Sequence, residues 1–263
     1  MSELAGLPGI GLAELIERAA LLTRIDRKYV LSRAGAFTLV QQLGPLTRVL
    51  DVDGLRQFRY ASVYFDTAEL TCFRLAAHRR RRRFKIRTRT YLDSAECWLE
   101  VKTRGTRAGT VKNRHPYRAD DGATIAPGRG FVDAALAGLA APRDLAPVLV
   151  TRYRRATLLL PGDAGRLTVD VDLAWEDADG RRLDLPGVAV VETKSRSGAS
   201  PVDRLLWARG NRPVALSKYA TGLAALRPDL PATPWRRTLR RWFVPSEGKE
   251  PSCLAPDEYS SAR

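Results

Sequence analysis

The stretch that decides the fold reads Phe84-Lys85-Ile86-Arg87-Thr88-Arg89-Thr90-Tyr91, and cationic and uncharged residues alternate along it without a break. Successive side chains of a β-strand point to opposite faces, so we expect Lys85, Arg87 and Arg89 to project from one side. Like charges held this close together repel each other. Such a surface predicts a densely charged anion as its ligand. The alternative for these three cations is a solvated outer face of a sheet.

The rest of the chain predicts a mostly antiparallel sheet with flanking helices. Strand patterns bounded by Gly, Pro and Asp lie at about 24–31, 59–66, 82–91, 97–104, 110–118, 150–160, 166–175 and 188–194. Helical spacing and capping residues predict helices at 12–22, 32–43, 131–139, 201–209, 217–226 and 234–243. Eight strands with short turns are typical of a closed or nearly closed antiparallel barrel in an α+β protein. We expect one domain, residues 1–244, and a disordered tail, residues 245–263.

Two arrangements of this barrel are compatible with the strand pattern. In residues 166–173 apolar side chains alternate with Arg, Thr and Asp, which predicts that Asp170 and Asp172 share one face. A simple barrel buries the apolar face inside. If helices cover the apolar outer face instead, charged side chains line a wet interior.

Charge and cysteine content limit the classes of function. The chain has 44 Lys and Arg against 29 Asp and Glu, a net charge of +15. This excess predicts a polyanionic partner such as nucleic acid, polyphosphate or an acidic membrane surface. Three cysteines without paired spacing and two histidines do not predict a disulfide framework or a zinc site. No apolar run approaches a membrane span and no secretion signal opens the chain, so we expect a cytoplasmic protein.

Carboxylates on the same strands further limit the class of ligand that we expect. Glu100, Asp170 and Glu192 lie among the strand cations. A nucleic-acid groove gains nothing from carboxylates aimed at phosphates, so nucleic acid is not the expected partner. A site that binds both phosphates and a divalent metal does benefit from carboxylates, because hard cations take oxygen ligands and bridge phosphoryl oxygens. For Glu192 a structural ion pair with an arginine is the alternative, and for Asp170 and Asp172 a structural salt bridge is at least as well supported as metal ligation.

An ordered series of motifs resembles a known family. The series comprises Arg24-Ile-Asp-Arg-Lys28-Tyr29, Ser62-Val-Tyr-Phe-Asp66-Thr67, Lys85-Ile-Arg87-Thr-Arg89-Thr-Tyr91, Leu99-Glu100-Val-Lys102, Val111-Lys112-Asn-Arg114, Tyr153-Arg-Arg155, Arg166-Leu-Thr-Val-Asp170, Val191-Glu192-Thr-Lys194 and Ser217-Lys218-Tyr219. Each motif is weak by itself, but nine in order resemble the VTC-type polyphosphate polymerase domain, a member of the triphosphate tunnel metalloenzymes. The resemblance covers residues 24–226.

The resemblance implies an eight-stranded tunnel whose cations grip a nucleotide triphosphate and a polyphosphate chain. It implies that the γ-phosphoryl group of ATP passes to inorganic polyphosphate, with Mn²⁺ or Mg²⁺ bound by Glu192. The implied catalytic residues are Arg87, Arg89, Lys102, Arg155, Arg166 and Lys218. The implied substrate-binding residues are Lys28, Lys85, Lys112, Arg114, Tyr153 and Ser217.

Departures from the family pattern leave other functions open. Asp26 stands where many relatives carry Glu, and the Glu-x-Glu-x-Lys of the hydrolytic tunnel enzymes is missing, which counts against triphosphate hydrolysis. Ala215 replaces a further lysine of the polymerase pattern. A triphosphate or polyphosphate hydrolase of the same fold is one alternative, and a non-catalytic polyphosphate- or nucleotide-binding module is another. Five consecutive arginines, residues 79–83, cannot all face one way, so part of this run is expected in a solvated turn.

Overall fold

The computed structural model describes residues 4–18, 25–104, 110–139, 141–163 and 165–243. The predicted tail, Arg24 and the end of the predicted first helix lie outside these residues. Within them the first helix, α1, spans Leu12–Arg18.

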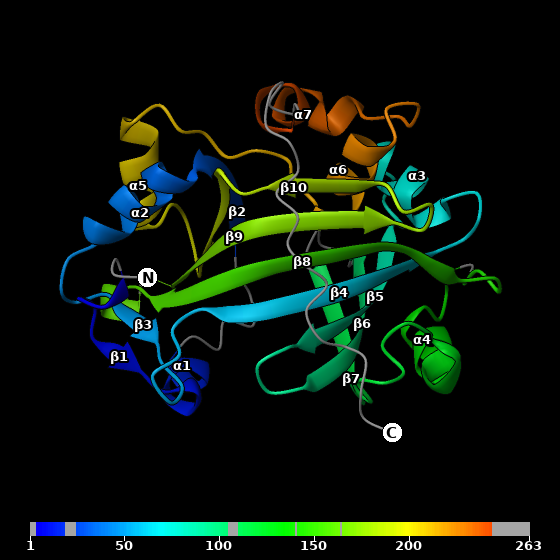
Figure 1. Ribbon diagram of the computed structural model, residues 1–263, viewed down its shortest axis with the longest axis horizontal. Helices are drawn as coiled ribbons and strands as arrows, with labels where there is room; N and C mark the ends of the chain where they lie inside the picture. The colour runs from blue at the N-terminus through cyan, green and yellow to red at the C-terminus, as the bar shows by residue number, and fades with distance from the viewer. Residues whose placement is uncertain (1–3, 19–24, 105–109, 140, 164, 244–263) are drawn as a thin grey trace.

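Eight strands form one antiparallel hydrogen-bonded path, as the sequence predicts (Figure 1). In spatial order they are β2 (Ile25–Ser32), β11 (Val188–Ser195), β9 (Arg166–Asp177), β8 (Ala146–Leu159), β4 (Phe58–Asp66), β5 (Phe84–Tyr91), β6 (Glu96–Arg104) and β7 (Thr110–Tyr117). Three short strands pair at the sides: β1 (Gly9–Ile10), β3 (Arg48–Leu50) and β10 (Arg182–Leu185). Among the described residues β2 and β7 do not pair, so the sheet is barrel-like but not closed.

The segment before helix α6 (Lys218–Leu226) connects the free edge of β2 with β5. The Val214 amide donates to the Lys28 carbonyl at 2.8 Å, which covers the free edge of β2. Three residues later Ser217 accepts a hydrogen bond from Lys85 Nζ on β5 at 2.9 Å. This connection brings β2, β5 and the first turn of α6 together.

Helices cover the outer face of the sheet, which decides between the two predicted arrangements. Leu167, Val169 and Val171 of β9 are buried in a cluster with residues of α2 (Arg33–Gln41) and α5 (Pro201–Ala208). On β5 and β6, outward-facing Ile86 and Leu99 are buried with residues of α3 (Thr71–Ala77) and α4 (Arg129–Ala135). In Figure 1, α2 and α5 lie together at one end of the long strands, and α3, α6 and α7 (Arg236–Trp242) gather toward the other. Charged side chains are therefore left to the interior.

An apolar cluster at one end of the barrel holds α6 in place. Trp175 of β9 turns inward and packs with Tyr219 and Leu223 of α6, and Phe243 packs against Trp175. The Trp175 indole donates to the Lys218 carbonyl at 2.8 Å. Gly222 permits this contact, because a Cβ there would lie 2.2 Å from the indole ring. The packing positions the first residue of α6, Lys218, at the interior.

The prediction that Asp170 and Asp172 share one face is wrong. The register of β8 and β9 shifts between Arg152 and Arg154, and Asp172 has a φ of 52°, in the left-handed region. Such a bulge reverses the facing of the residues that follow it. Asp170 points inward and is 1 % exposed, whereas Asp172 points outward and pairs with Arg33 and Arg154.

Helix α3 is an element that the sequence patterns do not predict. Its seven residues are too short for a periodic signal, but the Asp66 carboxylate organises its start. Asp66 accepts hydrogen bonds from the amides of Thr67, Cys72 and Phe73 at 2.8–2.9 Å. These bonds satisfy amides that a helix N-terminus otherwise leaves without partners.

Candidate active site

Three lysines lie side by side on the inner face of β5, β6 and β7. The strand register places Lys102 directly opposite Lys85 on one side and Lys112 on the other. Burial lowers the pKa of Lys85 and of Lys112 to about 8, and repulsion from Arg87 is the largest cause that lowers the pKa of Lys102. The row is electrostatically strained without an anion, as expected for a site that receives one.

The next row along the same strands is centred on the Glu100 carboxylate. Arg87 donates from Nε at 2.8 Å and Nη2 at 2.5 Å to Glu100 Oε2, and Lys112 pairs with Oε1. Arg87 also donates to the Tyr64 hydroxyl at 3.0 Å. Burial opposes ionisation of Glu100, but Arg87 and its neighbouring cations hold the pKa well below the usual range. Glu100 therefore stays ionised, and its carboxylate fixes the orientation of Arg87.

A second group joins β8, β9 and α6. Arg155 donates to Asp170 from Nε at 2.6 Å and from Nη2 at 2.8 Å, and Lys218 pairs with the same carboxylate. Burial works against the Asp170 carboxylate, yet Arg155 and Lys218 lower its pKa to about 2. The Lys218 ammonium lies 4.4 Å from the centre of the Tyr153 ring.

Tyr153 connects this second group to β5. Its hydroxyl accepts a hydrogen bond from Arg89 Nη2 at 2.9 Å. Burial alone would raise the pKa of Tyr153, but Arg89, Arg155 and Lys218 together bring it below its ordinary value. The hydroxyl is thus polarised by three cations in the interior.

The third group contains Glu192, the predicted metal ligand. Its Oε1 lies 3.3 Å from Lys28 Nζ on β2 and 2.7 Å from Lys194 Nζ on its own strand. Burial disfavours the charged form, but Lys28, Lys194 and Arg155 hold the pKa of Glu192 well below its usual range. Burial lowers the pKa of Lys194 to about 8.

The remaining predicted residues occupy the inner face or its edge. Arg166 lies opposite Lys194 on the face of β9 that carries Asp170. Arg114 is directly opposite Glu100 on edge strand β7, where its exposed guanidinium lies 5.0 Å from the centre of the Trp98 ring. Ser217 caps α6, accepting from the Ala220 amide, and also binds Lys85.

We call the convergent charged residues the interior cluster. It contains ten cations and three carboxylates: Lys28, Lys85, Arg87, Arg89, Lys102, Lys112, Arg155, Arg166, Lys194 and Lys218, with Glu100, Asp170 and Glu192. Each carboxylate already pairs with two cations of the cluster, so the surplus positive charge is available to a polyanion.

Sequence reasoning assigned no role to several residues of the interior. Lys194 follows Glu192 by two positions on one strand, so alternation alone would have placed it on the same face. Tyr64, Ser62 and Tyr60 similarly share the inner face of β4. Ser62 Oγ lies 3.4 Å from Arg89 Nε. The contacts of these residues depend on neighbouring strands, which alternation does not reveal.

The residues fit a divalent cation that is held mainly by a substrate. Among the described residues, no three His, Cys, Asp or Glu side chains gather into a metal-binding group. Both ion pairs of Glu192 use Oε1, so its second oxygen faces less competition from lysines. Mg²⁺ commonly takes one or two carboxylates and completes its shell with phosphates and water. A single carboxylate beside a phosphate site matches that donor set.

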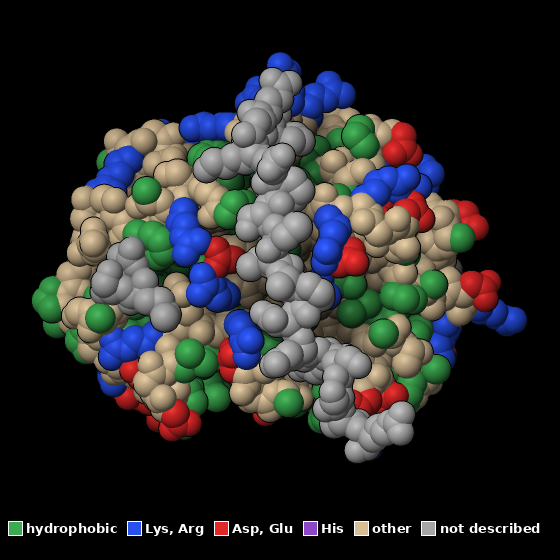
Figure 2. Space-filling model, in the orientation of Figure 1, with side chains coloured by type: hydrophobic (Ala, Val, Ile, Leu, Met, Phe, Trp, Pro, Cys, Tyr) green, Lys and Arg blue, Asp and Glu red, His purple; other side chains and the backbone are tan. Residues whose placement is uncertain are grey.

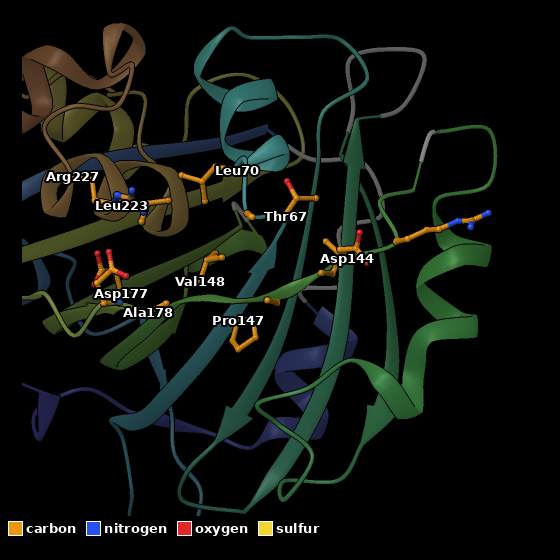
Figure 3. Close-up of a pocket in the computed structure, with 14 residues that line it drawn as sticks. Thr67, Leu70, Asp144, Pro147, Val148, Asp177, Ala178, Leu223 and Arg227 are labelled. Carbon is orange, nitrogen blue, oxygen red and sulfur yellow. Dashed lines mark hydrogen bonds between the residues drawn. The ribbon is translucent and has the colours of Figure 1, made fainter.

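Other surfaces of the molecule differ from the interior cluster. A pocket of about 680 Å³ lies at the start of β8, and Figure 3 shows Thr67, Val148 and Leu223 among its lining residues. It contains none of the predicted phosphate ligands. On the face in Figure 2, several Lys and Arg side chains lie beside acidic ones, in agreement with the outer pairs Arg59–Asp93 and Arg152–Glu176. Within the described residues no helix is long and apolar enough to cross a membrane.

A barrel-like sheet with an interior surplus of cations is suited to bind an anion. A family model described as VTC domain matches residues 23–227, which is more than half of the chain. The chain therefore belongs to the VTC-domain family, and the resemblance predicted from the motif series is confirmed. The extent of the domain, residues 1–244, stays a prediction.

Comparisons with solved structures return more distant similarities. A putative adenylate cyclase from Vibrio parahaemolyticus is 12% identical, with a TM-score of 0.46 over 77% of this chain and 98% of that one. A putative adenylyl cyclase from Hippeastrum with a dominant triphosphatase activity is 16% identical, with a TM-score of 0.49 over 77% of this chain and 96% of that one. No curated protein sequence is matched.

Proposed function

We propose that this protein is a metal-dependent polyphosphate polymerase that transfers the γ-phosphoryl group of ATP to a growing inorganic polyphosphate chain. Family membership supports a reaction of phosphate anhydrides, and the interior cluster supports polyanion binding. Two polyanions must approach each other in such a reaction. Ten interior cations reduce their mutual repulsion, which is the main task in phosphoryl transfer.

The proposal rests on one observation, which is that the three interior carboxylates are ion-paired and remain ionised. Glu100, Asp170 and Glu192 are each paired with two cations, and the pKa of each is lowered. A carboxylate with a depressed pKa is a weak proton acceptor and activates water poorly. A terminal phosphate oxygen of polyphosphate is already anionic and needs no base. The cluster therefore favours a phosphate acceptor over water.

The bond changes balance without a protein nucleophile. A terminal oxygen of the polyphosphate chain forms a bond to the γ-phosphorus of ATP, and the bond from that phosphorus to the β–γ bridging oxygen breaks. ADP leaves with the electron pair. Arg87 and Arg155 are held by Glu100 and Asp170 in fixed orientations, which suits them to contact phosphoryl oxygens during transfer. Arg89, Lys102, Arg166 and Lys218 would complete the cationic surround.

Glu192 would hold Mn²⁺ or Mg²⁺ in this proposal. When bound, the cation would neutralise charge on the β- and γ-phosphates. Lys28, Lys85, Lys112, Arg114, Tyr153 and Ser217 would bind the substrates. Tyr153 and Ser217 would do so through hydroxyl groups, which have both donor and acceptor capacity.

The deciding experiment incubates purified protein with ATP and Mn²⁺ or Mg²⁺ and separates the products on a gel. Formation of ADP with long polyphosphate supports the proposal. Free phosphate without polymer would identify a hydrolase of the same fold. Binding of tripolyphosphate without turnover under either metal would identify a non-catalytic module.

A further inference from the structure

The turn between α3 and β5 carries a surface that the proposed reaction does not use. Arg79, Arg80, Arg81 and Arg82 are all exposed in this turn, and we call them the arginine turn. Arg79 has a φ of 54°, in the position after a helix end that glycine usually occupies. A side chain at this position strains the backbone, so Arg79 combines backbone strain with a positive charge.

No carboxylate of the described residues neutralises the arginine turn. Within the described part of the chain, none of the four arginines forms an ion pair with Asp or Glu. By contrast, arginines on the outer faces of the strands are paired, as in Arg59–Asp93, at 2.8 Å, and Arg182–Glu176, at 3.2 Å. Four adjacent unpaired cations repel each other and favour an external anion.

A continuous ladder of cations links the turn to the interior cluster. Arg83 precedes β5 by one residue and lies two positions before inward-facing Lys85, so strand alternation directs both to the same side. Arg104 ends β6, two positions after Lys102. Because Phe84 is opposite Thr103, Arg83 and Arg104 lie at the same level. Burial, together with repulsion from Arg104, lowers the pKa of Arg83.

We propose that the arginine turn, with Arg83 and Arg104, binds the part of a polyphosphate chain that extends beyond the interior cluster. This inference rests on the proposed function and adds a second, external binding region for long chains. A phosphate chain has one anionic charge per unit and would continue along the ladder from Lys85 and Lys102 to Arg83, Arg104 and the turn. A triphosphate has three phosphate units, so we expect the interior cluster to hold it without a contact to the arginine turn.

The test compares ligands of different length on the full chain. The variant carries Arg80→Gln, Arg81→Gln and Arg82→Gln, which leaves the strained residue Arg79 and all interior residues unchanged. The matched control carries Arg236→Gln, Arg237→Gln and Arg240→Gln on α7, which removes the same charge from three exposed arginines elsewhere. Dissociation constants are measured at one ionic strength for tripolyphosphate and for long-chain polyphosphate.

The proposal expects the turn variant to lose about tenfold or more in affinity for long-chain polyphosphate, while its affinity for tripolyphosphate changes by less than about twofold. The α7 control should keep both affinities. Equal losses for both ligands, an equal loss in the control, or no loss at all would each overturn it. Single-stranded oligonucleotides and anionic vesicles are measured in parallel, and a loss confined to either would overturn it in favour of that partner.

The same measurements separate this inference from the proposed function. If the wild-type protein binds neither phosphate ligand, the proposed function has failed. If the wild-type protein makes polymer and the turn variant binds long chains as tightly as the wild type, only the external region is disproved.

Discussion

The Tyr219 hydroxyl of α6 donates a hydrogen bond to Asp66 Oδ2 at the end of β4, and both groups are buried. Asp66 also organises the start of α3, so one carboxylate joins β4, α3 and α6. Tyr219 follows Lys218, whose ammonium pairs with Asp170. The position of an interior cation is therefore tied to a hydrogen bond outside the interior cluster.

Replacing Tyr219→Phe should destabilise the protein and weaken turnover. The change leaves a buried carboxylate without one donor, which costs about 1–3 kcal/mol in the free energy of unfolding. Denaturant unfolding and the polymer assay measure the two effects. Tyr117→Phe is the control, because the Tyr117 hydroxyl donates a hydrogen bond to the exposed Thr124 carbonyl, at 3.0 Å, and not to a buried carboxylate. Equal stability of both variants would contradict the role given to Asp66.

Replacing Glu192→Gln should abolish turnover while tripolyphosphate still binds. The change removes a negative charge between Lys28 and Lys194, so metal-free binding of tripolyphosphate should tighten. Calorimetry and the polymer assay measure the outcome. Glu176→Gln, on the outer face beside Arg152, is the control and should leave both properties unchanged. Full activity of Glu192→Gln would show that the metal assignment is wrong.

Replacing Lys102→Met should stabilise the ligand-free protein and reduce activity. Lys102 lies between Lys85 and Lys112, and removal of the central charge relieves repulsion worth about 1 kcal/mol. Arg155→Met should also reduce activity but should destabilise by about 3 kcal/mol, because buried Asp170 loses its bidentate partner. Thermal unfolding distinguishes the two. A destabilised Lys102→Met would argue that the lysine row is not strained.

Stability should rise with pH just above neutrality. Burial lowers the pKa of Lys85 and of Lys194 to about 8, below the value for an unfolded lysine of about 10.4. Between these values the unfolded chain binds more protons than the folded one, so the free energy of unfolding increases with pH. The increase from about pH 7 to about pH 9 should be on the order of 1 kcal/mol in denaturant titrations. A flat or falling profile would contradict the lowered lysine pKa values.

The single substitutions Asp170→Asn and Asp172→Asn should affect activity differently, because the two residues lie on opposite faces of β9. Asp170→Asn weakens the interior ion pairs of Arg155 and Lys218, so activity should fall at least about tenfold. Asp172→Asn affects only outer pairs with Arg33 and Arg154 and should change activity by less than about twofold. Similar losses of activity in both variants would mean that the bulge does not give Asp170 and Asp172 different roles.

Much of the fold follows from local patterns. Alternation predicts the eight long strands, and Ser32 and Ser217 act as helix caps in sequence and in structure alike. The helix that was predicted to open at Pro201 is α5, and in the structure Ser200 caps it. The short elements α3, β1, β3 and β10 were not predicted, because each is too short to give a periodic signal. In addition, β1 and β3 pair with segments distant in sequence. The motif series predicted the family, and alternation predicted that Lys85, Arg87 and Arg89 share one face of a strand.

The amino-acid sequence by itself determined the strands, the surplus of positive charge and the family, because alternation, composition and motif order are local or additive properties. Only the tertiary structure decided that the charged face turns inward, since that depends on helices from distant segments covering the apolar face. It also decided that Asp170 joins the interior cluster while Asp172 does not, because a bulge between β8 and β9 is a property of two paired strands. The pairing of each interior carboxylate with two cations is likewise decided by the tertiary structure, because it depends on how the strands and α6 are arranged.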